Sequence, residues 1–250
     1  PAIVQHSGIR RCALNPQRTR LATLSDSATL RIWDIPPDIN LQRTLIHTVP
    51  IRNASFCGTN QMVATLDDTG DVALWKIPPK LVPGEFFETP FVLPTKATAM
   101  HASSDGRFLL TWQTNEARLW SLRDHQPTGL IFHKTADASA DSVFSPTGDY
   151  IALRKDRHSV SVCESATGKI LRDFPAEQPS QVAFSPLEDL MAVGDEHGII
   201  KLWRIGSGEI KAETQFENAG FRGFEFSPDG KLLLAGSLAT EDPSQTYQNG

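Results

Sequence analysis

Apolar and polar residues alternate along most of this chain, in short runs that are separated by polar turns. The stretch "LATLSDSATLRIWDI", residues 21–35, is typical, because two alternating runs flank a turn of small polar residues. A period of two predicts β-strands, since successive side chains of a strand point to opposite faces of its sheet. No stretch shows the 3.6-residue spacing of an amphipathic helix, so we expect an all-β fold with almost no helix.

The same pair of runs occurs five times along the chain. The later copies read "VATLDDTGDVALWKI", "LLTWQTNEARLWSL", "IALRKDRHSVSVCES" and "MAVGDEHGIIKLWRI". One aligned position, aromatic in four copies, recurs at intervals of 42, 45, 43 and 40 residues, at Trp33, Trp75, Trp120, Cys163 and Trp203. A regular interval of this length indicates a series of similar supersecondary units.

A second motif keeps the same interval and shows a sixth unit. It is an apolar anchor followed by a turn, as in "VFSPTGDYI" and "EFSPDGKLL", and its anchors are Leu14, Phe56, Ala102, Phe144, Phe184 and Phe226. Proline and glycine favour a tight turn here, since proline presets φ and glycine tolerates the conformation that follows. In the first unit we expect strands near 11–14, 20–25, 29–35 and 41–47.

Units of this length with four strands resemble the WD40 repeats of β-propellers. The stretches "LATLSDSATLRIWDI", "GIIKLWRI" and "FEFSPDGKLLLAGS" carry the resemblance. Only Trp33 and Asp34 form a complete Trp-Asp pair, because Trp75, Trp120 and Trp203 are followed by Lys, Ser and Arg. The resemblance implies an all-β, WD40-like β-propeller with six visible four-stranded blades, of which the last is incomplete.

We expect a single propeller domain, or a fragment of one, over residues 1–250. Residues 1–5 are candidates for a strand that closes the ring, and the blades are expected at about 6–47, 48–93, 94–134, 135–175, 176–215 and 216–250. The chain starts at Pro1 and shows no third strand in its sixth unit, so we expect an excerpt of a longer chain. The links "TGKIL" and "GSGEI" resemble those of propellers in bacterial multidomain proteins.

WD40 blades often hold a buried, hydrogen-bonded set of His, Ser or Thr, Asp and Trp. His47 lies nine residues before Phe56 and matches the histidine of this set. The family's turn aspartate lies six residues before the tryptophan, where this chain never has Asp, but the preceding position is acidic at Asp26, Asp68, Asp156 and Glu196. Either these acids simply favour solvated turns, or they form a partly acidic ring on the top rim.

Three arginines are candidates for binding a partner. Arg10, Arg52 and Arg222 each lie four residues before the anchor of their unit. The resemblance places such residues at the top mouth of the central channel, where a ring of six blades would make the three neighbours. Arginine is a common interface anchor because its planar guanidinium binds carboxylate or phosphate through two hydrogen bonds. The alternative is that these arginines pair with the nearby acidic turns within the fold.

Charge and cysteine content limit the partners and the cellular compartment that we expect for the protein. The formal net charge of −5 argues against broad nucleic-acid binding, since binding several phosphates usually needs a basic face. Cys12, Cys57 and Cys163 lie far apart and form no CxxC motif, which favours a reducing compartment, and we expect a cytoplasmic protein. No run approaches the length of an apolar membrane helix, so we expect no membrane partner.

The sequence offers little support for catalysis. The seven histidines form no HExxH motif, and neither a phosphate-binding GxxxxGK[ST] loop nor a GxSxG nucleophile motif is present. We therefore expect no catalytic residue, metal or cofactor, and a non-catalytic scaffold that binds protein or peptide partners, as a module of a larger signalling protein. One alternative is a propeller hydrolase that acts on a small lactone or glycan at the central channel. Another is a reader of nucleic acid or phospholipid through the arginines.

Overall fold

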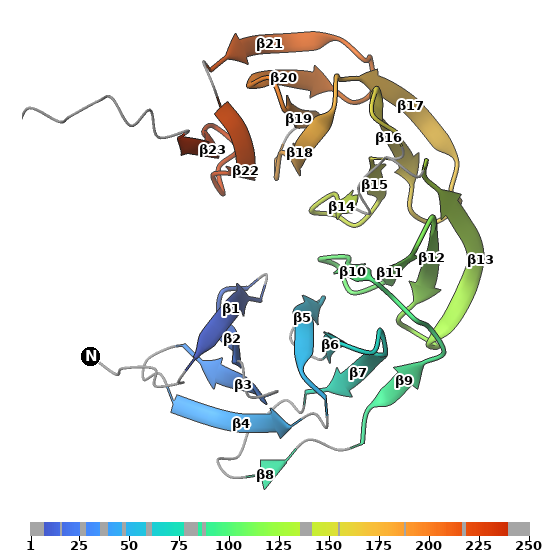
Figure 1. Ribbon diagram of the computed structural model, residues 1–250, viewed down its shortest axis with the longest axis vertical. Coiled ribbons are helices and arrows are strands. Elements are labelled where there is room, and N and C mark those ends of the chain that lie inside the picture. The colour runs from blue at the N-terminus through green and yellow to red at the C-terminus, as the bar shows by residue number, and fades with distance from the viewer. Residues whose placement is uncertain are drawn as a thin grey trace, which may run out of the picture.

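The computed structural model describes residues 8–15, 17–25, 29–35, 40–46, 49–58, 62–77, 85–86, 89–135, 142–154, 156–187, 189–216 and 219–239. All regular structure within these ranges is β-strand, arranged in six sheets. Figure 1 shows the sheets side by side along an arc, and in the first five the first strand lies toward the centre and the fourth at the periphery. The expected all-β propeller fold is confirmed.

The first sheet follows the strand pattern that alternation predicts. Its strands β1 to β4 lie in sequence order, and each begins and ends within two residues of the expected position. They are β1 (Ile9–Leu14), β2 (Arg20–Ser25), β3 (Thr29–Asp34) and β4 (Asn40–Ile46). The short strand β8 (Glu85–Phe86) comes from the link inside the second repeat and pairs in parallel with the outer edge of β4.

Four further sheets repeat this order of antiparallel strands. The second holds β5 (Ile51–Cys57), β6 (Met62–Asp67), β7 (Val72–Lys76) and β9 (Phe91–Leu93). The third holds β10 (Ala99–Ala102), β11 (Phe108–Gln113), β12 (Glu116–Ser121) and β13 (Gln126–His133). The fourth holds β14 (Ser142–Phe144), β15 (Tyr150–Leu153), β16 (Ser159–Glu164) and β17 (Ile170–Pro175). The fifth holds β18 (Pro179–Phe184), β19 (Leu190–Asp195), β20 (Ile199–Arg204) and β21 (Ile210–Gln215).

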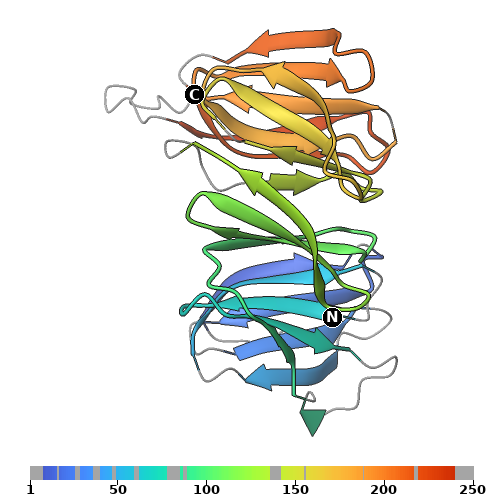
Figure 2. The ribbon, with the colours of Figure 1, turned by 90° about the vertical axis from the view of Figure 1, so that its right-hand side faces the viewer.

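In the part of the chain that the structure describes, the sixth sheet has two strands. It consists of β22 (Ala219–Phe226) and β23 (Leu233–Ala239). The inner strands pack in the order β1, β5, β10, β14, β18 and β22, and Figure 1 shows the arc open between β22 and β1. In the side view of Figure 2 the strands run roughly along the short axis of the molecule, as expected for a propeller. The candidate closing strand at 1–5 lies outside the described residues.

The apolar core lies between neighbouring sheets. Trp75 packs with Leu30 and Ile32 of the preceding sheet, and Trp203 packs edge-on against Phe174 with ring centroids 5.5 Å apart. Each described sheet therefore buries the apolar face of its neighbour, and this burial is the main force that holds the array together. Trp112, which the repeat leaves unexplained, is fully buried between the third and fourth sheets.

One polar contact joins the third and fourth sheets at the turns that follow their inner strands. Arg107 binds Asp105 of its own turn and donates from Nη2 to Oδ1 of Asp149 at 2.6 Å. Burial raises the pKa of Asp105, but hydrogen bonds from Ser103 and Arg107 outweigh it and leave the pKa below its usual range. The hydrogen bond from Arg107 also lowers the pKa of Asp149.

Candidate functional site

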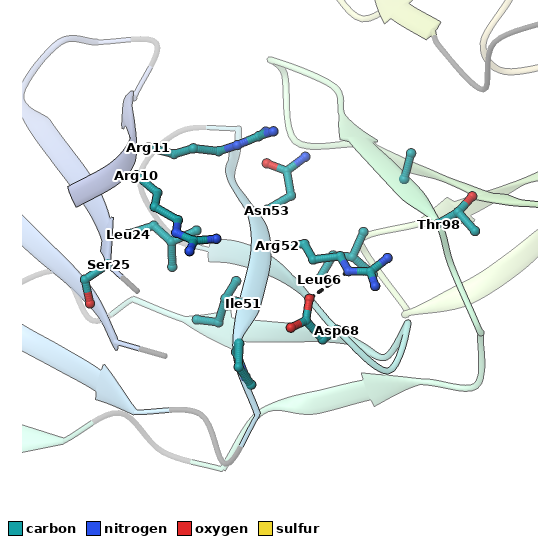
Figure 3. A pocket seen from close by; sticks show the side chains of 12 residues that line it. Arg10, Arg11, Leu24, Ser25, Ile51, Arg52, Asn53, Leu66, Asp68 and Thr98 are labelled. Carbon is teal, nitrogen blue, oxygen red and sulfur yellow. Dashed lines mark hydrogen bonds and ion pairs between the residues drawn. The ribbon is translucent and has the colours of Figure 1, made fainter. Parts of the chain in front are cut away.

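A pocket of about 1000 Å³ opens at the end of the first three sheets where the inner strands begin. We call this feature the mouth pocket. It lies between β1, β5 and the start of β10, and its polar lining is Arg10, Arg11, Ser25, Arg52, Asn53, Asp68 and Thr98 (Figure 3). Leu24, Ile51 and Leu66 are buried below these groups and give the pocket an apolar floor.

A β-bulge explains why neighbouring residues share the pocket. Strict alternation would send Arg10 and Arg11 to opposite faces of the sheet. In the ladder between β1 and β2, however, Ile9 is opposite Ser25 and Arg11 is opposite Leu24, so Arg10 is an extra residue. A bulge of this kind bends the strand and re-aims its side chains.

The same irregularity occurs in other inner strands. Arg52 is the extra residue of β5, and Asn53 follows it into the mouth pocket. The ladders of β18 and β22 skip Ser180 and Arg222 in the same way. The position four residues before each anchor is therefore the bulge position in four of the six inner strands. Sequence reasoning missed Arg11 and Asn53 because a bulge leaves no local signal in a pattern of period two.

Arg52 is held by an acidic turn. Its Nε donates to Oδ1 of Asp68 at 2.7 Å, and both side chains are about half exposed, at 52% and 48%. The amide of Asp68 donates to the carbonyl of Pro50 at 2.9 Å, which fixes the turn beside the start of β5. For Arg52, the structure thus supports the alternative reading, in which the arginine pairs within the fold.

Arg11 differs from Arg52 in its contacts. The side chain is exposed, and it makes no hydrogen bond or ion pair with any part of the chain that the structure describes. The side-chain amide of Asn53 likewise has no hydrogen-bond partner among the described residues. Figure 3 shows Arg10 and Arg11 leaving β1 on the side that faces Arg52 and Asn53. The mouth pocket therefore presents polar donors that are not used in the described fold.

The charge of the mouth pocket is opposite to that of the chain. Its charged lining consists of three arginines and one aspartate, a formal charge of +2, whereas the whole chain carries −5. A concave surface with one dominant sign of charge raises the local concentration of oppositely charged groups. Anionic ligands are thus the class that this pocket favours.

The structure brings two of the three predicted arginines together. Arg10 and Arg52 line the mouth pocket, whereas Arg222 lies on β22, whose position in Figure 1 is across the open side of the arc from β1. The side chain of Arg222 and the whole of His47 and Asp26 lie outside the described residues. Of the other predicted acidic positions, Asp156 accepts hydrogen bonds from His158 and Ser159 of its own turn, and Glu196 is exposed.

The repeated tryptophans keep part of the family's buried polar set. The indole Nε1 atoms of Trp33, Trp75 and Trp120 donate to threonine hydroxyls at 2.8, 2.9 and 2.8 Å, and the acceptors are Thr23, Thr65 and Thr111. Asp34 accepts a hydrogen bond from Arg20 at 3.1 Å. The Nε1 of Trp203 is buried and has no hydrogen-bond partner among the residues that the structure describes.

Two buried aspartates lie outside the position, six residues before the tryptophan, at which the family's turn aspartate was expected. Oδ1 of Asp67 accepts hydrogen bonds from the amides of Thr69 and Asp71, at 2.9 and 3.0 Å. Oδ1 of Asp195 accepts two equivalent bonds from its own turn, both at 2.9 Å. Each directly precedes the acidic residue that the sequence analysis singled out, so the doublets "DD" and "DE" were the available signal.

The described residues offer no metal centre, and two of the three thiols are buried. No group of three His, Cys, Asp or Glu side chains among them could hold a metal ion. Burial raises the pKa of the Cys57 and Cys163 thiols to about 12, so both remain protonated at neutral pH. Within the part of the chain that the structure covers, no helix is long and apolar enough to cross a membrane.

Comparison with known proteins finds one matching family and several relatives that are similar over part of the chain. The family described as "WD domain, G-beta repeat" matches residues 2–34. The chain is 28% identical to WD repeat-containing protein 90 of Xenopus tropicalis over 36% of its length, and 35% identical to eukaryotic translation initiation factor 3 subunit I of Pyricularia oryzae over 36%. It is 36% identical to apoptotic protease-activating factor 1 of Homo sapiens over 27% of its length. These matches cover 5%, 27% and 7% of the three relatives, so the chain spans only a minor part of each.

Proposed function

Because the chain is a WD40-repeat protein, a class of scaffold for protein interactions, we propose that it binds protein or peptide partners at the mouth pocket without catalysing a reaction. The observation that carries this proposal is the pocket itself. Side chains from three sheets, Arg11, Asn53 and Thr98 among them, face one opening on a rigid scaffold. Variable residues at the ends of a rigid array suit recognition, since they can change without altering the core.

The composition of the mouth pocket favours binding over hydrolysis. Hydrolysis of a glycan generally uses two carboxyl groups on either side of the scissile bond. Asp68 is the only carboxylate in the described lining, and it is already paired with Arg52. The net charge of −5 also favours a protein partner over nucleic acid.

We also propose that the protein works in a reducing compartment such as the cytoplasm, as a module of a larger signalling protein. All three cysteines are free thiols, and two of them are buried where they contribute to packing. A reducing environment keeps such thiols unpaired.

A steric variant tests the proposed face without changing its charge. Thr98 and Thr128 are both exposed, and the hydroxyl of each donates to a backbone carbonyl, at 3.3 and 3.0 Å. Thr98→Trp would fill the mouth pocket, whereas Thr128→Trp places the same bulk on the outer strand β13. Affinity capture with the full-length protein, followed by mass spectrometry, should recover partners with the native and Thr128→Trp proteins and lose them with Thr98→Trp. Equal recovery with both variants, or turnover of a small substrate without any recovered protein, would contradict the proposal.

A further inference from the structure

We infer that the mouth pocket recognises an acidic segment of a partner protein, and that Asp68 is an internal stand-in that a ligand carboxylate displaces from Arg52. This inference rests on the proposed function and names the chemistry of its ligand. Three features of the described structure carry it: the positive lining, the exchangeable ion pair and the donors that the fold leaves unused.

The ion pair between Arg52 and Asp68 shows that Arg52 can bind a carboxylate in this pocket. Its Nε to Oδ1 distance of 2.7 Å is that of a strong charge-assisted hydrogen bond to a carboxylate. Both partners are about half exposed, however, and an ion pair in that setting contributes little net stability. A carboxylate from another chain can therefore replace Asp68 at small cost, because Asp68 regains its hydration when it is released.

Arg11 supplies the contact that makes the exchange favourable. A guanidinium has five N–H donors, and those of Arg11 have no partner among the described residues. The Asn53 amide lies in the same pocket with its own unused hydrogen-bonding groups. An incoming acidic side chain gains bonds at Arg11 and Asn53 that Asp68 does not make. Asp68 thus sets a lower limit on the affinity that a ligand needs, since a ligand with a single weak contact would not displace it.

The shape of the site favours a peptide over a free anion. The pocket holds about 1000 Å³ and extends over three sheets, which is far more than one small anion fills. Its apolar floor at Leu24, Ile51 and Leu66 can accept an aliphatic side chain next to the acidic ones. An apolar core surrounded by a polar rim is typical of a protein interface. We therefore commit to a peptide segment with Asp or Glu residues as the occupant.

Binding can be followed at the arginine side chains themselves. The full chain, labelled with ¹⁵N in arginine, is titrated with a short peptide of alternating glutamate and serine, and the Nε–Hε signals are recorded by NMR. The matched peptide with glutamine in place of glutamate serves as the neutral arm. Inorganic phosphate and a phosphoserine peptide serve as further arms. Signals are assigned from Arg11→Lys and Arg52→Lys.

The inference predicts that the glutamate peptide shifts the signals of Arg11 and Arg52 but not that of Arg118, an exposed arginine on β12. Arg11→Gln and Arg52→Gln should each weaken binding about five- to tenfold, the scale of a charge-assisted hydrogen bond. Asp68→Asn should tighten it about two- to fivefold, because it removes the internal competitor. Arg118→Gln and Glu116→Gln are the matched controls, since that pair is also exposed and its atoms lie 3.8 Å apart.

Weaker or unchanged binding in Asp68→Asn would overturn the stand-in role. Equal binding of the glutamate and glutamine peptides, or a response to phosphate groups without one to glutamate, would overturn the assignment of an acidic protein segment. If the titration fails while Thr98→Trp still abolishes partner capture, only this inference fails. If Thr98→Trp leaves capture intact, the proposed binding face itself is wrong.

Discussion

The unsatisfied indole of Trp203 leads to an unusual prediction, in which adding a hydroxyl to the core stabilises the protein. In three sheets the tryptophan Nε1 donates to a threonine on the second strand, and the ladder partner of that threonine lies two residues before the tryptophan. In the fifth sheet this position is Val193, which is opposite Lys201 and packs in the same apolar cluster as Trp203. The position that supplies the hydroxyl acceptor in the other three sheets is therefore occupied by a valine.

We expect Val193→Thr to stabilise the protein by about 1 kcal/mol. Satisfying a buried donor recovers about 1–3 kcal/mol. Exchanging a buried methyl group for a hydroxyl loses about 0.8 kcal/mol of apolar burial. The new hydroxyl can donate to the Lys201 carbonyl, as Thr65 donates to the Ala73 carbonyl at 3.4 Å, so it would not itself remain unpaired. For a chain of this length the gain corresponds to a rise in melting temperature of about 2–4 °C.

Urea unfolding followed by circular dichroism measures the free energy of unfolding of the variant. The control is a double-mutant cycle with Trp203→Phe, which removes the N–H donor. In that background Val193→Thr should destabilise, since the hydroxyl no longer has an indole to accept from. Thr65→Val is the reverse exchange and should lose about 1–2 kcal/mol. A loss of stability in Val193→Thr equal to that in the Trp203→Phe background would refute the reasoning.

Further predictions concern the other contacts described above. Arg107→Gln should cost up to about 1 kcal/mol at neutral pH, the scale of an exposed ion pair. Arg107 lowers the folded-state pKa of two carboxyl groups, so its contribution to stability is present above their unfolded pKa of about 3.9 and is lost as the pH falls through the folded-state values. The stabilities of the native protein and the variant should therefore converge in acid. Urea unfolding at a series of pH values checks this, and a difference that stays constant with pH would contradict it. In the native protein a thiol reagent should modify Cys12, which is exposed, while the two buried thiols with a pKa of about 12 react only after unfolding, as mass spectrometry of the labelled protein would show. Gly106→Ala should lower stability by about 2 kcal/mol in thermal unfolding, since φ is +76° and the new Cβ would lie 2.8 Å from Cα of Gly58 in the neighbouring sheet; an unchanged melting temperature would show that these turns can move apart.

Much of the fold could be predicted from alternation and interval alone. In the first sheet the expected strands at 20–25 and 29–35 agree with β2 and β3 to within one residue. The interval also located the aromatic position correctly, including Cys163, which is fully buried in the place of a tryptophan. These features follow from local patterns, because a strand with one buried face must repeat its apolar residues every second position.

The candidate site was only partly predictable. The spacing before each anchor pointed to Arg10 and Arg52, and both line the mouth pocket. It did not point to Arg11 or Asn53, because a bulge depends on the pairing partner in the next strand and not on the strand's own residues. Nor could it decide whether Arg52 meets Asp68, which requires the turn after β6 to reach the start of β5.

The sequence by itself determined where most strands lie and which side of the central strands is buried, since these depend on the order of apolar and polar residues along a few positions. Only the tertiary structure decided which polar side chains meet. The bulges that gather the arginines, the carboxylate that occupies Arg52 and the indole that lacks an acceptor all arise between strands or turns that are far apart in the chain. Such contacts depend on register and packing geometry, which no local pattern encodes.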